Sequence, residues 1–313
     1  MRRIRIVSVS VVLLLMVLAS ACTGAATPLA PTAAPTDTPE PVVLPETGGE
    51  PASPAAVNFE QLENLDRDNF DDPTNIDNQW MPFHPGMRWV FEGSTEEAGL
   101  NIPHRVIFTV TEFTKVIDGV RSVVVWDQDF SNNELVETEL AFYAQDNDGN
   151  VWRMGEYPEV YELGKLVEAP AWISGFKGAK AGIMMKADPQ KGDPSYAQGW
   201  GPAVNWTDRG QVAEIGQETC VPFECFENVL IIEEFSREEP DAFQLKYYAP
   251  GVGNIRVGWR GADATKETLE LIEFVQLSPE AMEEARAAAL ELEQRAYVNS
   301  KEVYDQTPPL EGQ

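Results

Sequence analysis

Carboxylates are the residues of this 313-residue sequence with the most obvious chemical potential. Two carboxyl groups at a suitable separation can act as general acid and as base or nucleophile in glycoside hydrolysis. On a strand that alternates polar and apolar residues, the same groups are expected to form a solvated face. The acids concerned are Asp127, Asp129, Glu134, Glu137, Glu139, Glu233 and Glu234. We expect them to face solvent, and we keep an envelope hydrolase that uses a carboxylate pair as an alternative function.

Other catalytic motifs are absent from the sequence. It contains no G-x-S-x-G elbow, no H-E-x-x-H pair and no G-x-x-x-x-G-K-[ST] loop. The two histidines, His84 and His104, have no sequence-near partner that would make either a general base, so we expect both in loops or at the surface. The sequence therefore predicts no catalytic residue and no cofactor, and a non-enzyme is the preferred interpretation.

One short run could present oxygen ligands to a hard cation. Asp146, Asp148 and Asn150 form a D-x-D-x-N pattern of the kind that binds Ca²⁺. However, Gly149 is the fourth rather than the sixth residue of the run, and Tyr157 stands where an EF-hand has its bidentate Glu. A turn between two strands explains the same residues. We prefer the turn and keep the metal site as the alternative.

The eight tryptophans are a further candidate binding feature. Most occur one per predicted strand or loop, as is typical of the aromatic core of a β domain. Trp172, Trp200 and Trp206 instead fall in or just after the Gly-, Pro- and Lys-rich stretch 159–202. Long irregular segments inside a compact domain are often functional. These three tryptophans are therefore the predicted ligand-binding residues, with core filling as the competing explanation.

The N-terminus has the three parts of a bacterial lipoprotein signal. A basic start precedes an apolar run over 7–18, and small residues over 19–21 lead to Cys22. We expect residues 1–21 to be removed as a signal peptide and Cys22 to be acylated. The protein would then be lipid-anchored and extracytoplasmic, in the cell membrane or envelope. An ordinary secretory signal, which would leave Cys22 free, is the alternative.

The charge balance limits the classes of partner. The sequence has 23 basic and 51 acidic residues, a formal net charge of −28. Such a chain has little means of neutralising phosphates through Lys and Arg, which argues against a nucleic-acid-binding protein. It is also repelled by anionic headgroups, so attachment to a membrane must come from acyl chains.

Residues 22–57 are predicted to form a lipidated, disordered stalk rich in Pro, Thr and Ala. Within this stalk, residues 44–48 read LPETG, the form of a sortase motif. Sorting signals lie near the C-terminus and precede an apolar segment, which is not the case here. We interpret the match as a coincidence, because a motif needs its structural context.

From residue 58 the sequence becomes globular and alternates with a period of two. β-branched and aromatic stretches are separated by Asp-Gly turns at 118–119 and 148–149, which is typical of antiparallel hairpins. We predict a single, mainly β, antiparallel domain over residues 58–277, arranged as a curved sheet, a sandwich or a half-barrel.

A helix is predicted over 278–299, because Ser278 can cap it and Pro279 suits its first position. Its apolar stripe is narrow, so we expect it to lie along the sheet or the domain edge. Residues 300–313 are predicted to be a flexible tail.

Cys220 and Cys225 remain once Cys22 is acylated. In an oxidising compartment such a pair is expected to form a disulfide. The four residues between them include Pro222, which favours a turn, so the bridge would close a hairpin. A zinc half-site and a redox-active pair are competing interpretations, but neither the further ligands nor the C-x-x-C spacing is present.

Several segments resemble a family of uncharacterised bacterial secreted proteins and lipoproteins. They include NIDNQWMPFHPG at 75–86, YAQDNDGNVW at 143–152 and KYYAPGVG at 246–253. The resembling stretches together span residues 70–276. The resemblance implies the same fold and an extracytoplasmic compartment, and it carries no activity or ligand.

These features predict a membrane-anchored extracytoplasmic lipoprotein whose β domain binds a ligand or partner without performing chemistry. Its expected partners are the membrane, through the lipid anchor, and either a small hydrophobic ligand or an envelope protein. Besides the hydrolase, a structural subunit of an envelope complex remains an alternative.

Overall fold

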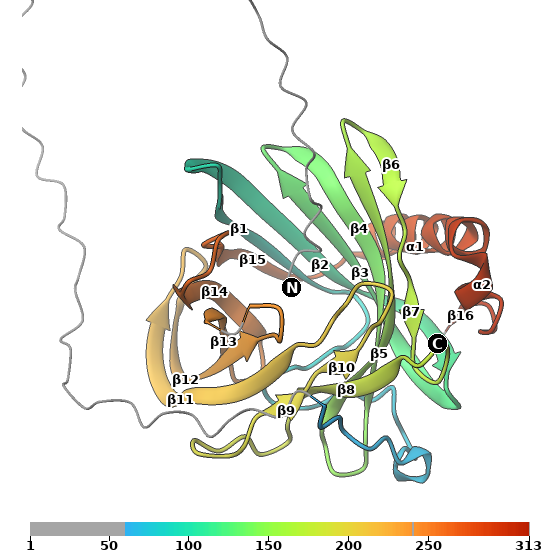
Figure 1. Cartoon of the computed structure of the whole chain (residues 1–313), viewed down its shortest axis with the longest axis horizontal. Coiled ribbons are helices and arrows are strands. Elements are labelled where there is room, and N and C mark those ends of the chain that lie inside the picture. The colour runs from blue at the N-terminus through green and yellow to red at the C-terminus, as the bar shows by residue number, and fades with distance from the viewer. Residues whose placement is uncertain (1–59, 240, 313) are drawn as a thin grey trace, which may run out of the picture. The chain divides into compact units, whose positions relative to one another are not determined.

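The computed structural model of the chain describes residues 60–239 and 241–312. The predicted signal peptide (1–21), Cys22 and the stalk (22–57) lie outside the described residues. Within the described part, sixteen strands form one antiparallel sheet that curls into a nearly closed barrel, with a helix on its outside (Figure 1). The prediction of a mainly β, antiparallel domain with a C-terminal helix is confirmed.

The barrel consists mainly of two five-strand meanders, β1–β5 and β11–β15, in which each strand pairs with the next along the chain. The strands are β1 (Met87–Glu97), β2 (Leu100–Ile117), β3 (Val120–Ser131), β4 (Glu134–Gln145), β5 (Val151–Glu162), β6 (Lys165–Glu168), β7 (Trp172–Ile173), β8 (Lys180–Met185), β9 (Tyr196–Ala197), β10 (Gly199–Trp200), β11 (Arg209–Cys220), β12 (Cys225–Phe235), β13 (Ala242–Ala249), β14 (Gly253–Gly261), β15 (Thr268–Gln276) and β16 (Glu311–Gly312). The helical segments are η1 (Arg67–Asn69), α1 (Pro279–Asn299) and α2 (Lys301–Tyr304).

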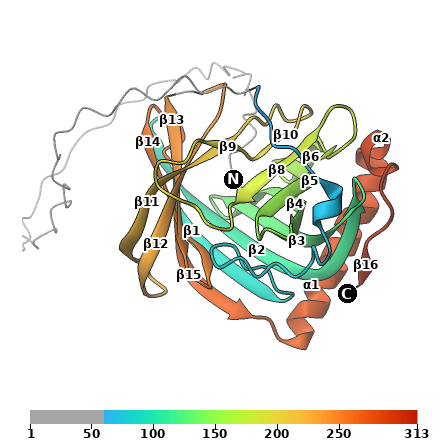
Figure 2. The same ribbon diagram turned by 90° about the horizontal axis from the view of Figure 1, so that it is seen from below.

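The two meanders meet along two seams. At the first seam β1 pairs with β15. At the second, β8 pairs with β5 and β9 pairs with β11, while β10 pairs back onto β8. Only Gln198 separates β9 from β10, so this short run of chain reaches both edges of the second seam (Figure 2). The Gly- and Pro-rich middle of the chain therefore completes the barrel.

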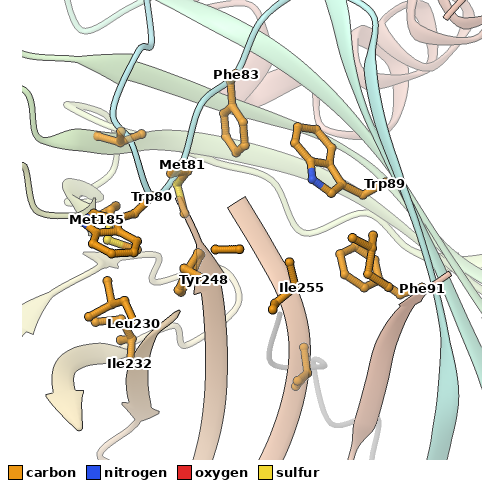
Figure 3. Close-up of a cluster of buried hydrophobic side chains, with 14 of the residues drawn as sticks. Trp80, Met81, Phe83, Trp89, Phe91, Met185, Leu230, Ile232, Tyr248 and Ile255 are labelled. Atoms are coloured by element: carbon orange, nitrogen blue, oxygen red, sulfur yellow. The ribbon is translucent and has the colours of Figure 1, made fainter. Parts of the chain in front are cut away.

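The apolar part of the barrel interior is filled by the loop that precedes β1. Asn78 Oδ1 accepts hydrogen bonds from the backbone N–H groups of Trp80 (2.9 Å) and Met81 (3.2 Å), which fixes a tight turn. The turn directs Trp80, Met81 and Phe83 into the barrel. They pack there with residues of the surrounding strands, among them Trp89, Phe91, Leu230, Ile232, Tyr248 and Ile255 (Figure 3).

Helix α1 covers the outer face of the first meander. Ser278 caps it by accepting a hydrogen bond from the Ala281 N–H (3.3 Å), and Pro279 is its first residue, as the sequence predicts. Its buried stripe is narrow and consists of Ala285, Ala289, Leu292, Glu293 and Ala296. This face packs on outward-facing side chains of the first meander in a second hydrophobic cluster.

The end of the chain folds back onto the barrel. β16 pairs with β2, and Tyr304 at the end of α2 is fully buried. Beneath them, Lys115 Nζ donates to Glu293 Oε1 (2.8 Å) and to the carbonyl oxygen of Pro308 (2.7 Å). We call Lys115, Glu293, Tyr304 and Pro308 the Lys115 cluster. Residues 301–312, within the segment predicted as a flexible tail, thus contribute to the outer core.

The disulfide prediction is confirmed. Cys220 and Cys225 are bridged, with their Cα atoms 3.9 Å apart. They are the last cross-strand pair of the β11–β12 hairpin, and the Val221 N–H donates to the Glu224 carbonyl within the turn (3.0 Å). The bridge therefore holds the register at the closed end of this hairpin.

Candidate functional site

The inward-facing residues of β3 and β4 change from apolar to acidic along each strand. On β3 they run Val123, Val125, Asp127, Asp129, and on β4 they run Tyr143, Ala141, Glu139, Glu137. Asp127 is directly opposite Glu139 in the register, and Asp129 is opposite Glu137. One end of the barrel interior is therefore apolar and the other end is acidic.

The expectation that these acids form a solvated face is wrong for Asp127 and Glu139, which are 3% and 4% exposed. The reason is that the outward face of the same strands carries the apolar residues that pack beneath α1. The acidic residues that alternate with them on β3 and β4 therefore face the barrel interior. Asp129 and Glu137, closer to the β3–β4 hairpin, are half-buried.

The remaining acids of the predicted set divide between the two faces. Glu134, at the hairpin between β3 and β4, is exposed. Glu233 lies on the outer face of β12 and accepts two hydrogen bonds from Arg260 (2.7 Å each). Glu234, the next residue, points inward and is 5% exposed.

Arg153 is the central cation of this end of the barrel. A β-bulge before Gly155 places both Arg153 and Glu156 of β5 on the inner face. The guanidinium donates to Glu139 Oε1 (2.8 Å), to the Tyr143 hydroxyl (2.9 Å) and to Glu156. Arg153 thus links two carboxylates and a phenol across β4 and β5.

Asp127 has no comparable partner. Both of its carboxyl oxygens are buried, and neither has a hydrogen-bond partner within residues 60–239 and 241–312. Burial, followed by repulsion from Glu139 and Asp129, raises the pKa of Asp127 well above its usual range. Burial and the same kind of repulsion also raise the pKa of Glu137, while burial outweighs the opposing effect of Arg153 and raises the pKa of Glu156 to about 7.

His104 lies within β2 and is buried, so the expectation of a loop or surface histidine is wrong for it. Its Nε2 is 2.7 Å from Asp129 Oδ1 and its Nδ1 is 3.0 Å from Glu267 Oε1. Burial alone would lower the pKa of His104, but the hydrogen bonds to both carboxylates raise it to about 9. Glu267, despite its burial, has its pKa lowered to about 2 by His104.

The second meander contributes the other wall. Gln244 Nε2 donates to Glu267 Oε2 (2.6 Å), while the Gln244 Oε1 atom is buried and has no hydrogen-bond partner in the described part of the chain. Lys246 Nζ is 3.9 Å from Glu234 Oε2, and Gln198 Nε2 donates to Glu234 Oε1 (2.7 Å). We define the acidic interior as His104, Asp127, Asp129, Glu137, Glu139, Arg153, Glu156, Glu234, Gln244, Lys246 and Glu267.

The structure separates the three predicted tryptophans. The rings of Trp172 and Trp206 lie 5.2 Å apart, and Arg153 lies over the Trp206 ring at 5.1 Å. The Trp172 ring rests on Gly201, where a Cβ atom would come within 2.7 Å of the indole. Trp172 is 2% exposed, so this pair closes the acidic interior from the side of the middle segment.

Trp200 precedes Gly201, the residue that contacts Trp172. Because neighbouring residues of an extended segment point to opposite faces, Trp200 points away from Trp172. It lines a surface pocket of about 220 Å³ together with Arg209 and Arg237. The Arg209 guanidinium already donates hydrogen bonds to the Ser195 hydroxyl and to the Gln61 carbonyl (2.7 Å). The three tryptophans therefore do not form one site.

The D-x-D-x-N run forms a turn between β4 and β5. Asp146 accepts hydrogen bonds from the Asn150 backbone (2.8 Å) and from the Trp152 indole (2.8 Å), and Asp148 accepts one from Asn69 (2.9 Å). The carboxylate of Asp146 thus stabilises the turn. In residues 60–239 and 241–312, no group of three or more His, Cys, Asp or Glu side chains is arranged to hold a metal ion.

Sequence reasoning missed several members of the acidic interior, namely His104, Arg153, Glu156, Gln244, Lys246 and Glu267. Arg153 was detectable in principle, because it is a lone cation in a strand that is otherwise mostly apolar. Glu267 was not, since its contact with His104 joins residues far apart in the sequence. Among the described residues, no helix has the length and apolar character required to cross a membrane.

Comparison with known proteins gives few relatives. No family model matches the chain, and no curated protein matches it. Among solved structures it is similar to an exported protein with a YmcC-like fold from Bacteroides fragilis, at 9% identity and a TM-score of 0.33. It is also similar to a lipoprotein from Parabacteroides distasonis, at 12% identity and a TM-score of 0.33. Each match covers 63% of this chain and 99% of the other, and neither carries an argument about function.

Proposed function

We propose that the protein is a lipid-anchored, extracytoplasmic binding protein that holds a small ligand in the acidic interior of its barrel. The location is supported by the lipoprotein-type signal that ends at Cys22. The binding role rests on one observation: both carboxyl oxygens of Asp127 are buried and lack a hydrogen-bond partner in the part of the chain that the structure describes.

A buried polar group without a partner costs about 1–3 kcal/mol, and more when it is charged. Such groups are rare in folded proteins and call for a specific explanation, such as a bound molecule or a catalytic role. A ligand that donates hydrogen bonds to Asp127 would remove this cost on binding.

The rest of the interior supports a polar ligand at this end of the barrel. Trp80, Met81 and Phe83 already pack among the apolar side chains of the other end (Figure 3). A small hydrophobic ligand, which the sequence led us to expect, would have to displace them. A polar ligand beside Asp127 requires no such rearrangement of the core.

Native mass spectrometry of the full-length protein, extracted in detergent from its host envelope, tests the binding role. We expect a retained small molecule on the wild-type protein, and its loss from Asp127→Asn. Glu134→Gln is the matched control, because it removes one acid from the exposed end of the same hairpin. A wild-type protein with no bound molecule, or equal retention by Asp127→Asn, would contradict the proposal.

The anchor is tested separately. We expect Cys22→Ala to release the protein from the membrane fraction, because acyl chains are the proposed attachment of this strongly acidic chain. Partition of wild type and variant between membrane and soluble fractions gives the answer. A Cys22→Ala protein that stays as membrane-bound as wild type would contradict a lipid anchor.

One observation favours hydrolysis as a second candidate. Asp127 and Glu139 are cross-strand partners, Asp127 has a raised pKa, and Glu139 accepts a hydrogen bond from Arg153. A protonated acid beside a carboxylate is the arrangement that glycoside hydrolases use. Turnover of aryl glycosides that is abolished by Asp127→Asn would support this candidate, and ligand retention without turnover would support the binding protein.

A further inference from the structure

The charges of the acidic interior do not balance. Seven carboxyl groups face three cationic side chains. The carboxyl groups are Asp127, Asp129, Glu137, Glu139, Glu156, Glu234 and Glu267, and the cationic residues are His104, Arg153 and Lys246. An excess of buried negative charge is costly unless a positive charge is added or protons are taken up.

Each built-in cation is already engaged. Arg153 contacts Glu139 and Glu156, and His104 bridges Asp129 and Glu267. Lys246 contacts Glu234. These contacts leave Asp127 as a buried carboxyl group whose oxygens have no hydrogen-bond partner among the described residues.

The unpartnered atoms also define which chemical group is needed. Asp127 Oδ1, Asp127 Oδ2 and Gln244 Oε1 are buried without a hydrogen-bond partner among the described residues, and all three accept hydrogen bonds once Asp127 gives up its proton. In the same interior Arg153 Nε is a buried donor without a partner among those residues. Gln244 is neutral, so it indicates a donor independently of the charge imbalance. A ligand with several N–H or O–H groups would satisfy the three acceptors, which outnumber the unpartnered donor.

Aromatic rings flank the same acids. Phe108 is the cross-strand partner of Asp127 on β2, and its ring centroid lies 6.5 Å from that of Tyr143. Carboxylates together with aromatic faces are the surroundings in which proteins bind organic ammonium and guanidinium groups. The combination favours an organic cation over a bare metal ion.

Burial of the inward-facing acids decreases along β3 and β4 from Asp127 toward the hairpin. The inward residues closer to the hairpin end, Asp129 and Glu137, are half-buried rather than buried. Asp127 lies four residues from Ser131 at the end of β3, which corresponds to about 13 Å along a strand. A ligand that enters from the hairpin end would therefore pass Asp129 and Glu137 before it reaches Asp127.

From this juxtaposition we infer that the acidic interior binds a small organic cation with primary-amine or guanidinium groups, whose N–H donors pair with Asp127 and Gln244. The inference rests on the proposed function and specifies its ligand class. One doubly charged molecule would reduce the excess of four carboxyl groups to two and would also satisfy the unpartnered acceptors.

Isothermal titration calorimetry of the full-length protein in detergent with putrescine and agmatine tests this inference. We expect saturable binding of at least one of them, and no binding of butanediol, which has the same length as putrescine without the charge. Asp127→Asn and Glu137→Gln should each weaken binding at least tenfold, whereas Glu134→Gln should leave it unchanged. The Glu137 variant provides a second measurement, because its half-buried site tolerates substitution more readily.

Proton release gives an independent readout. A bound cation lowers the pKa of Asp127 and Glu137, so binding should release protons and its apparent enthalpy should differ between phosphate and Tris buffers. Binding of Ca²⁺ in place of both amines would overturn the inference. So would a neutral or anionic molecule retained from the host, although the proposed binding function would then stand. A protein that retains nothing from its host and binds none of the probes would overturn both.

Discussion

The Lys115 cluster and the acidic interior are two groups of buried charges on opposite faces of the first meander. On the outer face, one ammonium meets one carboxylate, and Lys115 lies over the Tyr304 ring at 4.5 Å. Glu293 Oε1 also accepts the Leu310 N–H (2.9 Å), which holds the end of the chain in place. On the inner face, carboxyl groups outnumber cations, and the Asp127 carboxyl oxygens have no hydrogen-bond partner among the residues that the structure describes.

The difference shows which buried charges serve the fold. A matched pair such as Lys115 and Glu293 fixes where α1 and the C-terminal residues pack, and it needs nothing from outside the chain. An unmatched group such as Asp127 makes the protein without ligand less stable. Loss of the Lys115 charge should therefore destabilise the fold, whereas loss of the Asp127 charge should stabilise the protein without ligand.

The largest effect is expected on the outer face. Lys115→Ala should lower the free energy of unfolding by about 3–5 kcal/mol, because Glu293 would remain buried without its cation. Urea unfolding measures this change. The double variant Lys115→Met with Glu293→Leu should recover most of the loss, and a double variant as unstable as Lys115→Ala would contradict the assignment.

On the inner face, loss of the His104 proton should lower the free energy of unfolding as the pH rises from neutral to alkaline. The pKa of His104 is raised from 6.5 to about 9, so its contribution is fully present below pH 6.5 and is lost as the pH passes 9. The shift corresponds to about 3 kcal/mol. Thermal unfolding should show a Tm that drops across this window, and His104→Gln should flatten the profile. An unchanged slope in His104→Gln would argue against a charged His104.

Asp127→Asn should raise the free energy of unfolding, whereas Lys115→Ala should lower it. Above pH 4 the folded protein keeps a proton on Asp127 that the unfolded chain releases, so stability is lost as the pH rises. The neutral amide avoids this loss, and we expect a gain of about 1–3 kcal/mol at pH 8 without ligand, shrinking toward pH 4. Urea unfolding of wild type and variant at pH 8 and at pH 4 measures this gain. Destabilisation by Asp127→Asn at pH 8 would mean that Asp127 has a structural partner.

Local features of the fold were predictable from the sequence. The Cys220–Cys225 bridge closes a turn of four residues, and the cap at Ser278 acts on a residue three positions later. The strand alternation was also correct. What the sequence did not indicate was which face of the first meander would be covered by α1, because that depends on how the two meanders close into a barrel.

The candidate site was less predictable for the same reason. The alternating pattern placed Asp127 and Glu139 on one face, yet the face became buried only through the closure of the barrel. His104 contacts Glu267, which is so far away in the sequence that no local pattern could indicate the pair. Trp200 and Trp206 were predicted to share a site because both lie in or near the Gly- and Pro-rich stretch. In the structure Trp200 instead points outward and lines the surface pocket.

The smallest predicted effect separates these two tryptophans. Trp206→Leu removes the ring that Arg153 lies over, and cation–π contacts of this kind contribute about 0.5–2 kcal/mol. We expect urea unfolding to show a loss of about 1 kcal/mol, and Trp200→Leu to change stability by less than about 0.5 kcal/mol. In an Arg153→Met background the Trp206→Leu loss should shrink, because the two variants remove the same contact. If the losses instead add fully, Trp206 packs against the barrel without interacting with the charge of Arg153, and the acidic interior is closed on that side by apolar contact alone.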